Sequence, residues 1–256
     1  MSPRGKFIVL EGIDGSGKRT QLDMLAQAFA DRGSPCALVS FPRYDGFFGQ
    51  LVARFLNGDF GPLKSVDPHF SALLYAGDRL EAKPDLDAHL AAGRAVLSDR
   101  YIGSNLAHQG ARVPRAKRNE FLDWLQHLEY DVYDLPREDL VIYLRVPPSV
   151  AQGLVARKAA RGYTKKKRDL QEASLAHLEA ASAVYDVLAS RHNWRTIDCA
   201  ASSTAITKAR SAGRAKTSGH ASRQSPALQL RLPEEIHKEV LAAVDACLAL
   251  SRQANA

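Results

Sequence analysis

The segment that decides the expected fold is Phe7-Ile8-Val9-Leu10-Glu11-Gly12-Ile13-Asp14-Gly15-Ser16-Gly17-Lys18-Arg19-Thr20. Residues 7–10 are apolar and predict a short buried strand. The spacing Gly12-x-x-x-x-Gly17-Lys18 follows, and apolar residues then recur at helical spacing from Leu22 to Phe29. In a strand–loop–helix context of this kind, backbone N–H groups and the helix N-terminus bind phosphate oxygens. The segment therefore predicts a phosphate-binding loop (P-loop) in an α/β domain.

Apolar runs and helical patterns alternate along the rest of the chain. Asp67-Pro68 is typical of a helix start, and Gly33 of a helix end. Further buried strands are predicted at residues 36–39, 95–97, 140–144 and 194–197, and further helices at 67–92, 115–130, from 147 onward, 170–191 and 233–251. This alternation predicts a three-layer α/β fold, a five-stranded parallel sheet flanked by helices.

The length and composition suit one domain spanning residues 1–256. The chain has 256 residues, of which 45% are hydrophobic. Residues 200–230 are rich in Ala, Ser and Thr and poor in large apolar residues, so we expect a flexible insertion there. No apolar run reaches the roughly 18–20 residues of a membrane span, and the N-terminus has no signal-peptide pattern. We therefore expect a cytoplasmic protein without a membrane association.

The net charge of +7 comes from two local runs of basic residues. Residues 157–168 contain seven basic residues and no acidic residue, and residues 199–233 contain six more, again without an acidic residue. Outside these runs acidic residues outnumber basic ones, so the net charge does not indicate a general nucleic-acid-binding surface, and we expect no nucleic-acid partner. Three widely spaced cysteines give neither a disulfide framework nor a zinc site.

Phosphate and metal chemistry is expected at the P-loop and at the end of the strand 95–97. Residues 12–20 would bind ATP, with Lys18 reaching the β- and γ-phosphates. Asp99 and Arg100 follow that strand, where a carboxylate could face Mg²⁺ and a guanidinium a phosphate. The residue after the motif lysine is Arg19, where Ser or Thr normally ligates Mg²⁺. Either Thr20 takes that role, or Mg²⁺ is held by carboxylates and phosphates.

Tyr75 and Arg79 lie four residues apart and thus on one face of a predicted helix. An aromatic ring beside a guanidinium suits a flat base joined to a phosphate. In isolation the same pair is also consistent with a core tyrosine and a solvated arginine, and Asp99-Arg100 with a structural ion pair.

Four blocks in a conserved order give this chain its resemblance to a family. They are the segment from Phe7 to Gln21, Phe41-Pro42-Arg43-Tyr44, Leu73-Leu74-Tyr75-Ala76-Gly77-Asp78-Arg79, and Asp99-Arg100-Tyr101-Ile102-Gly103-Ser104-Asn105-Leu106-Ala107-His108-Gln109-Gly110. Together they resemble the thymidylate kinase (dTMP kinase) family of P-loop nucleoside monophosphate kinases. The likeness runs from about Lys6 to Asp198 and resumes near Pro233.

The resemblance implies transfer of the γ-phosphoryl group of ATP to dTMP, forming dTDP and ADP with Mg²⁺. It implies that Asp14 approaches the sugar 3′-hydroxyl and the metal, that Tyr75 stacks on thymine, and that Arg100 binds the acceptor phosphate. The remaining residues that it places around dTMP are Phe41, Arg43, Arg79, Ser104, Asn105 and His108. Asp99, Asp14 and Thr20 are the candidate metal ligands. A homodimer is expected from the resemblance alone.

The basic run at residues 157–168 falls at the position of the family's lid. One subgroup carries a catalytic arginine inside the P-loop, where this chain has Gly15, and the other supplies the cation from the lid. Arg157 and Arg161 are therefore the candidate catalytic cations. Asp169 and Glu172 follow at the spacing of a helix cap, and Glu172 is also a candidate for contact with dTMP.

Two departures from the family pattern keep alternatives open. The family usually has Tyr or Phe at His108, near the deoxyribose, so another nucleoside or nucleoside-monophosphate kinase is the second hypothesis. Arg19 is the one feature that favours a non-catalytic P-loop nucleotide-binding protein, and Lys18, Asp99 and Arg100 argue against it.

Overall fold

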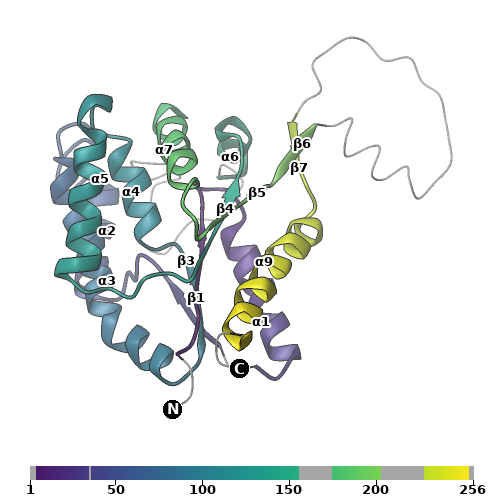
Figure 1. The fold of residues 1–256 in the computed structure, drawn as a ribbon. Helices are drawn as coiled ribbons and strands as arrows, with labels where there is room; N and C mark the ends of the chain where they lie inside the picture. Colours follow the sequence, from purple (N-terminus) through teal and green to yellow (C-terminus); the bar gives the residue numbers. More distant parts are fainter. Residues whose placement is uncertain (1–3, 35, 156–174, 203–227, 254–256) are drawn as a thin grey trace, which may run out of the picture.

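The computed structural model describes residues 4–34, 36–155, 175–202 and 228–253. Five parallel strands form the central sheet in the order β2-β3-β1-β4-β5 (Figure 1). Their bounds are β1 Phe7–Glu11, β2 Cys36–Ser40, β3 Ala95–Asp99, β4 Leu140–Arg145 and β5 Trp194–Asp198. The predicted five-stranded parallel sheet is therefore confirmed.

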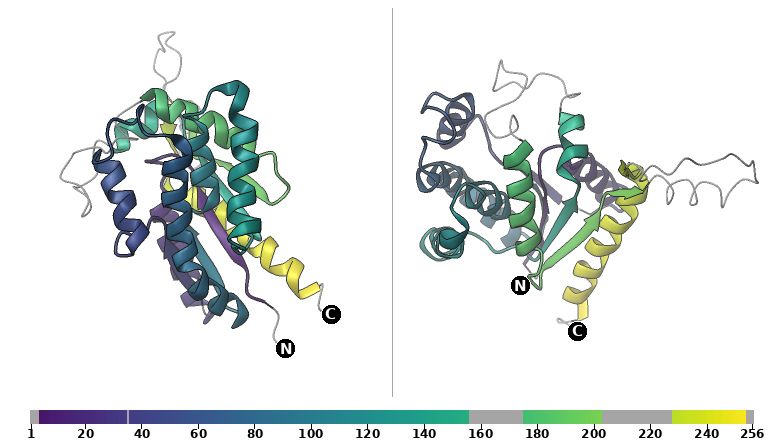
Figure 2. Two further views of the ribbon diagram at one scale, coloured as in Figure 1. Left: turned by 90° about the vertical axis from the view of Figure 1, so that its left-hand side faces the viewer. Right: turned by 90° about the horizontal axis from the view of Figure 1, so that it is seen from above.

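Helices cover both faces of this sheet. On one face, α1 packs against α9, and on the other α4 packs against α3 and α7, so that the sheet lies between two helical layers (Figure 2). The α-helices are α1 Lys18–Asp31, α2 Phe47–Asn57, α3 Pro68–Ala91, α4 Ile102–Gly110, α5 Arg118–Gln126, α6 Pro148–Val155, α7 Leu175–Leu188 and α9 Pro233–Gln253. A 3₁₀ turn at Arg115–Lys117 precedes α5, and a π-helical turn at His127–Val132 follows it.

The carboxyl ends of β1, β2 and β3 bring the functional segments together. Leu10 is paired with Asp99, and Ser40 with Asp99 from the other side. Ligands of open α/β sheets bind beyond these strand ends, where the chain leaves the sheet. The P-loop, the start of the 41–44 block and the residues after β3 therefore share one edge of the sheet.

The main hydrophobic core lies between the sheet and its helices, and its central strands are almost completely buried. Strand β2 is an exception to our prediction of a buried strand. Among the described strands it pairs with β3 alone, at the edge of the sheet, and Leu38 is 51% exposed. A strand that is covered by a neighbour on one side alone leaves part of its surface to solvent.

One predicted helix start is confirmed, because Asp67 caps α3 by accepting a hydrogen bond from the His69 backbone N–H at 2.7 Å. Several other helical boundaries differ from those predicted. The helix predicted at 115–130 is divided into the 3₁₀, α and π turns given above. Of the helix predicted at 170–191, residues 170–174 lie outside the described residues and α7 ends at Leu188. Helices α2 and α4 were not predicted.

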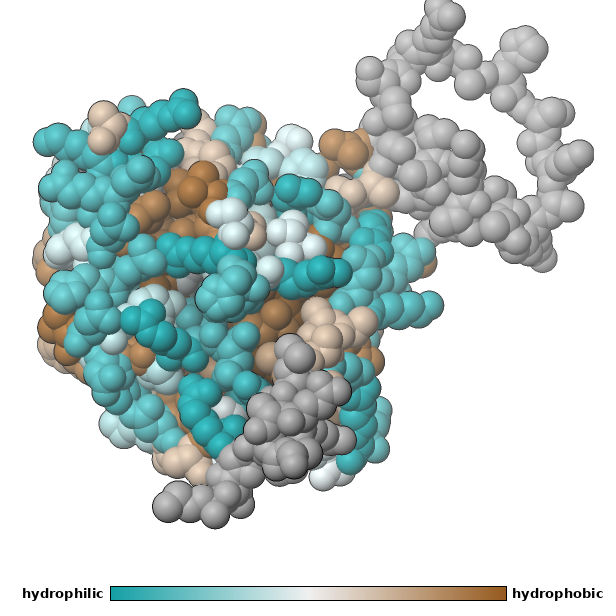
Figure 3. Space-filling model, viewed as in Figure 1, coloured by the Kyte–Doolittle hydropathy of each residue, from teal (hydrophilic) through white to brown (hydrophobic). Residues whose placement is uncertain are grey.

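The predicted insertion at residues 200–230 begins and ends in a small antiparallel pair. Strand β6, Ala200–Ser202, pairs with β7, Leu228–Leu230, and the residues between them lie outside the described part of the chain. On the face seen in Figure 3, hydrophilic residues predominate and hydrophobic residues show between them in smaller areas. In the described part of the chain, no helix combines the length and the apolar character that a bilayer span requires.

Candidate active site

The P-loop connects β1 to α1 as the sequence predicts. Gly12, Gly15 and Gly17 have φ angles of 146°, 86° and 90°, which side chains other than glycine rarely adopt. A Cβ atom on Gly12 would also lie 2.7 Å from the carbonyl oxygen of Leu144. Gly17 precedes α1 without a side-chain cap, so the first N–H groups of that helix are directed at the loop. This arrangement suits phosphate oxygens.

The Lys18 side chain lies inside the loop rather than in solvent. Its ammonium group donates hydrogen bonds to the carbonyl oxygens of Gly12 at 2.9 Å and Ile13 at 3.0 Å, and only 6% of the residue is exposed. Burial, with a smaller contribution from the positive charge of Arg100, lowers the pKa of Lys18 to about 8. An anion placed in the loop would restore the stability of the charged form.

The two residues after the lysine differ in their position relative to the cavity. Arg19 lies at the edge of the cavity described below and forms an exposed ion pair with Asp23 at 2.9 Å. Thr20 is exposed and is not among the residues that line the cavity. The two predicted alternatives to the usual Mg²⁺-ligating hydroxyl therefore differ, because Asp99 lines the cavity and Thr20 does not.

Asp99 and Arg100 end β3 beside the P-loop. The Oδ1 atom of Asp99 is buried and has no hydrogen-bond partner among the described residues. Arg100 has a φ of 71°, a conformation that is uncommon for a residue with a side chain. The Ser98 hydroxyl donates to the Arg100 carbonyl oxygen at 2.6 Å, and the Arg100 N–H donates to Leu10 at 2.9 Å. These contacts hold the turn that directs the guanidinium toward the P-loop.

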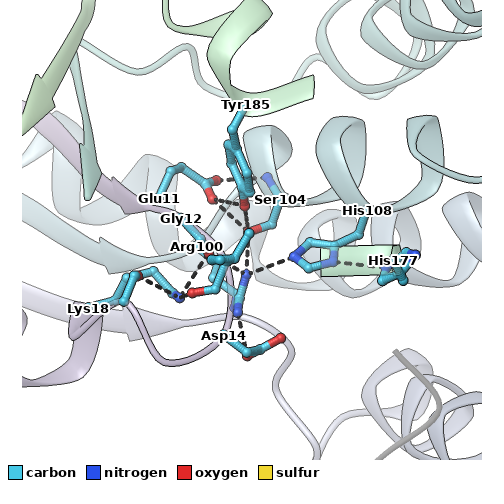
Figure 4. Close-up of polar contacts among 11 residues, drawn as sticks. Glu11, Gly12, Asp14, Lys18, Arg100, Ser104, His108, His177 and Tyr185 are labelled. Atoms are coloured by element: carbon cyan, nitrogen blue, oxygen red, sulfur yellow. Dashed lines mark hydrogen bonds and ion pairs between the residues drawn. The ribbon is translucent and has the colours of Figure 1, made fainter. Parts of the chain in front are cut away.

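The guanidinium of Arg100 joins four parts of the site (Figure 4). Its Nη2 donates to Asp14 Oδ1 at 2.7 Å, and its Nη1 lies 2.9 Å from Ser104 Oγ, 3.2 Å from the Gly12 carbonyl oxygen and 3.4 Å from His108 Nε2. The nearby carboxylate of Asp14 raises the pKa of Arg100 despite its burial, so it stays charged. A planar cation in this position can bind a phosphate through two parallel hydrogen bonds.

Glu11 supports this arrangement from behind, a role that our sequence analysis missed. It is fully buried and accepts hydrogen bonds from the backbone N–H groups of Tyr101 and Ser104, both at 2.9 Å. The hydroxyls of Ser104 and Tyr185 donate to its other oxygen at 2.6 and 2.9 Å. Burial raises the pKa of Glu11 above its usual value. By accepting the two backbone N–H groups, Glu11 caps the start of α4, where the helix dipole favours an acceptor. The sequence signal that could have identified Glu11 is an acidic residue at the junction between a predicted buried strand and the P-loop.

Helices α3 and α4 supply a base-sized polar surface. Arg79 is 1% exposed, and its guanidinium donates to both oxygens of the fully buried Glu129 at 2.5 and 2.7 Å. The Asn105 amide nitrogen donates to the Ala72 carbonyl oxygen at 3.0 Å and to Glu129 at 2.8 Å. Because both partners are acceptors, the amide orientation is fixed. Asn105 Oδ1, which has no partner among the described residues, is left as an acceptor.

One cavity of about 320 Å³ joins these groups. Its volume is within the usual range for small-molecule sites, roughly 300–1,000 Å³. The predicted residues that line it are Asp14, Gly15, Gly17, Lys18, Arg19, Phe41, Tyr75, Arg79, Asp99, Arg100, Ser104, Asn105 and His108. Lys18 and Asp99 are therefore brought into the same cavity as Tyr75 and Asn105.

Other predicted site residues lie outside this cavity or outside the described chain. Arg43 is held by Asp78, through its backbone N–H at 2.9 Å and its Nε at 3.3 Å, and does not line the cavity. The lid at 157–168 with Arg157 and Arg161, together with Asp169 and Glu172, falls in the segment 156–174, which is not among the described residues.

Comparisons with known proteins identify relatives of this chain. The family model for thymidylate kinase matches residues 10–209. A thymidylate kinase from Mycobacterium tuberculosis is 32% identical over 186 residues, covering 72% of this chain and 86% of that protein. The thymidylate kinase of Homo sapiens is 34% identical over 143 residues, covering 56% of this chain and 62% of that protein. A solved structure of thymidylate kinase from Candida albicans matches with a TM-score of 0.60 at 23% identity, covering 77% of this chain and 85% of that chain, and supports the fold.

Proposed function

The chain belongs to the thymidylate kinase family, and we propose that the cavity described above is where it transfers the γ-phosphoryl group of ATP to dTMP, forming dTDP and ADP. One observation carries this placement. The cavity is lined both by the P-loop lysine and by Tyr75 and Asn105, and Arg100 contacts Asp14 of the P-loop as well as Ser104 of α4. A donor phosphate and an acceptor nucleotide can therefore meet at Arg100.

The thymine base of dTMP fits the surface formed by α3 and α4. Asn105 Oδ1 is an acceptor that suits the N3–H group of thymine, and Arg79 can offer N–H groups that its ion pair with Glu129 leaves over. Tyr75 also lines the cavity, and its ring packs edge-on against Phe55 with centroids 6.3 Å apart. A ring fixed in this way is suited to stacking on a flat base, and Phe41 adds a second aromatic wall.

Replacing Tyr75 with alanine should weaken dTMP binding by roughly 1–3 kcal/mol, which is the usual contribution of base stacking on an aromatic side chain. Isothermal titration calorimetry with dTMP measures this difference, and Tyr75→Phe is the matched control because it keeps the ring. A dTMP affinity that is unchanged in Tyr75→Ala would mean that Tyr75 is a core residue and not a base contact.

The acceptor phosphate is assigned to Arg100 and the sugar to Asp14 and His108. The acceptor phosphate is already an anion at neutral pH, so no residue has to remove a proton from it. This chain's contribution is to hold donor and acceptor in line and to neutralise charge as it shifts during transfer. Arg43, which is fixed by Asp78, would act on the acceptor phosphate only if it left that ion pair.

Lys18 is proposed to bind the β- and γ-phosphates of ATP. Its ammonium group already lies in the loop, where carbonyl oxygens occupy its hydrogen bonds. Bound phosphates would take over these bonds and favour the protonated form.

This change in environment predicts a pH dependence of ATP binding. Lys18 has a pKa of about 8 in the ligand-free protein, and bound phosphate would raise it. At pH 8, binding of MgATP should therefore take up about half a proton, and affinity should fall as the pH rises above 8. Calorimetry in two buffers with different ionisation enthalpies measures the uptake. Lys18→Met should abolish it, and equal heats in both buffers for the wild type would contradict this assignment.

A Mg²⁺ ion fits the donor set at the end of β3. Asp99 Oδ1 is a buried carboxylate oxygen with no partner among the described residues, and Asp14 lies in the same cavity. We therefore assign the ion to Asp99 and Asp14, together with phosphate oxygens and water, and give Thr20 a lower rank because it is exposed. When bound, the ion would neutralise charge on the transferring phosphates. From the sequence alone, we also propose that Arg157 and Arg161 act as catalytic cations of the lid and that Glu172 contacts dTMP.

A coupled ADP-release assay with dTMP, dUMP, UMP, CMP and thymidine tests the proposed reaction. We expect the highest kcat/KM with dTMP. Fastest turnover with UMP or CMP would point to another nucleoside-monophosphate kinase, and the absence of turnover with every acceptor would favour a nucleotide-binding protein without phosphotransferase activity.

A homodimer is proposed from the family resemblance, with support from an apolar stripe on α3. Phe70, Leu73 and Leu80 lie on one side of this helix and are 44%, 38% and 38% exposed. Size-exclusion chromatography with light scattering should give twice the mass of one chain, and Leu73→Glu should give a single-chain mass. A wild-type monomer at micromolar concentration would refute the dimer.

We also propose a single domain of residues 1–256, a cytoplasmic location and a dispensable insertion at 200–230. Strands β6 and β7 pair with each other, so the chain leaves and returns to the domain at one place. Removal of the intervening residues would therefore leave the ends of β5 and α9 close to their present positions.

A further inference from the structure

Two histidines meet beside Arg100. His108 lines the cavity from α4, and its Nδ1 lies 3.3 Å from Nε2 of His177 on α7. Its other ring nitrogen, Nε2, lies 3.4 Å from Nη1 of Arg100 (Figure 4). Only 5% of His108 and 8% of His177 is exposed. Both ring nitrogens of His108 are thus engaged by other side chains.

The chemistry of the neighbours fixes the direction of these hydrogen bonds. An arginine guanidinium can only donate, so His108 Nε2 must accept. A neutral imidazole that accepts at one nitrogen carries its proton on the other, and Nδ1–H of His108 therefore donates to His177 Nε2. The order of donation runs from Arg100 through His108 to His177.

The surrounding charges are consistent with two neutral rings. Burial lowers the pKa of His108 well below its usual value, the positive charges of Arg100 and Lys18 and the neighbouring His177 lower it further, and Asp14 opposes them. Burial lowers the pKa of His177 to about 4, with Arg112 acting in the same direction and Asp14 against it. At neutral pH both imidazole rings are therefore uncharged. The order of donation from Arg100 through His108 to His177 requires this state.

We propose that His177 is a positioning residue for sugar selection: by accepting the Nδ1–H of His108, it holds that ring so that no nitrogen faces the sugar of the acceptor. This inference rests on the proposed function, which places the deoxyribose beside His108. A ring whose nitrogens are both engaged offers a 2′-hydroxyl neither a donor nor an acceptor. A ribonucleotide would then lose the hydration of its 2′-hydroxyl without a replacement.

Loss of the acceptor on His177 should change this property of the site. Without it, the Nδ1–H of His108 would be a buried donor lacking a partner, and the ring would turn or change tautomer to reach another group. A nitrogen that then faces the cavity could hydrogen-bond to a 2′-hydroxyl. The change therefore favours ribonucleotides more than it harms dTMP.

The test compares dTMP with ribothymidine 5′-monophosphate, which differs only by the 2′-hydroxyl. We expect His177→Leu to lower the ratio of their kcat/KM values by about 10-fold, within the range by which a site discriminates one polar group. His177→Gln should keep most of the ratio because its amide oxygen can accept the same hydrogen bond. Melting temperatures of the variants measure any general loss of stability.

A double-mutant cycle separates positioning from a merely structural role. His108→Phe removes the ring nitrogens, so adding His177→Leu to it should leave the ratio unchanged. A ratio that stays at the wild-type value in His177→Leu, or that falls equally with and without His108→Phe, would overturn the inference. A wild type that does not phosphorylate dTMP would refute the proposed function instead.

Direct observation of the tautomers does not depend on a folded variant. Long-range ¹H–¹⁵N NMR spectra of the wild-type protein at pH 7 should show His108 protonated on Nδ1, and His177 unprotonated on Nε2. A proton on Nε2 of His108 would contradict the order of donation and with it the positioning role of His177.

Discussion

Replacing Arg100 with alanine should lower kcat/KM for dTMP by roughly 10²- to 10³-fold, the cost of removing a preorganised charge-stabilising donor. Arg100 links the P-loop to α4, because its fork contacts Asp14, Gly12 and Ser104. Its loss would remove both a phosphate contact and the link that holds Asp14. Steady-state kinetics with varied dTMP at saturating MgATP measures the effect.

The control for this prediction is Arg100→Lys. It keeps the positive charge but has no planar fork, so activity should lie between those of the wild type and Arg100→Ala. Alanine and lysine would both have to adopt the same positive φ of 71° at this position, so the two variants carry the same backbone strain. Kinetics of Arg100→Ala within a few fold of the wild type would exclude Arg100 from the reaction.

Replacing Glu11 with alanine should lower the free energy of unfolding by about 3–5 kcal/mol, the usual cost of removing the partner of buried polar groups in a charged network. Four donors lose their acceptor, among them the backbone N–H groups of Tyr101 and Ser104 at the start of α4. Because α4 carries Ser104, Asn105 and His108, the KM for dTMP should rise as well. Urea denaturation measures the stability.

Glu11→Gln is the matched control, since its amide oxygen can still accept from the two backbone N–H groups. The pKa of Glu11 is raised in the folded state, so the folded protein binds more protons than the unfolded one between the two pKa values. The stability that Glu11 contributes should therefore fall as the pH rises through this window, so the difference in stability between the wild type and Glu11→Gln should shrink with rising pH. Wild-type stability in Glu11→Ala would show that α4 does not depend on this carboxylate.

The parts of the site that the sequence predicted are those set by local pattern. A P-loop is a contiguous segment with its own strand and helix, so Lys18 could be assigned directly. Asp99 and Arg100 follow a strand, and the carboxyl ends of parallel strands share one edge of the sheet, so their position beside the loop was also predictable.

The partners of these residues could not be predicted, because they come from distant segments. Glu11 and Tyr185 are 174 positions apart, and Arg79 and Glu129 are 50 apart. Glu129 lies in a π-helical turn, and none of the sequence patterns that we used predicts such a turn. Such contacts depend on how α3, α4 and α7 pack, which periodicity alone does not specify.

The two helices that were not predicted differ in their reasons. In α4, the polar residues Ser104, Asn105 and His108 line the cavity instead of facing solvent, and every residue of the helix is buried, so α4 lacks the exposed polar face of an amphipathic surface helix. In α2, by contrast, Gly49, Val52 and Phe55 form a buried face at helical spacing, and that signal was present in the sequence. The position of strand β2 was predicted correctly, but the prediction that it is buried was wrong. Apolar composition does not reveal which strand lies at the edge of the sheet.

A crystal structure with dTMP, a non-hydrolysable ATP analogue and Mg²⁺ is the most direct test of the proposed site. We expect the dTMP phosphate on the Arg100 guanidinium, thymine against Tyr75 with its N3–H on Asn105 Oδ1, and the donor phosphates around Lys18. Mg²⁺ should bind on the side of Asp99. A dTMP molecule bound outside this cavity, or one whose phosphate does not contact Arg100, would contradict the account.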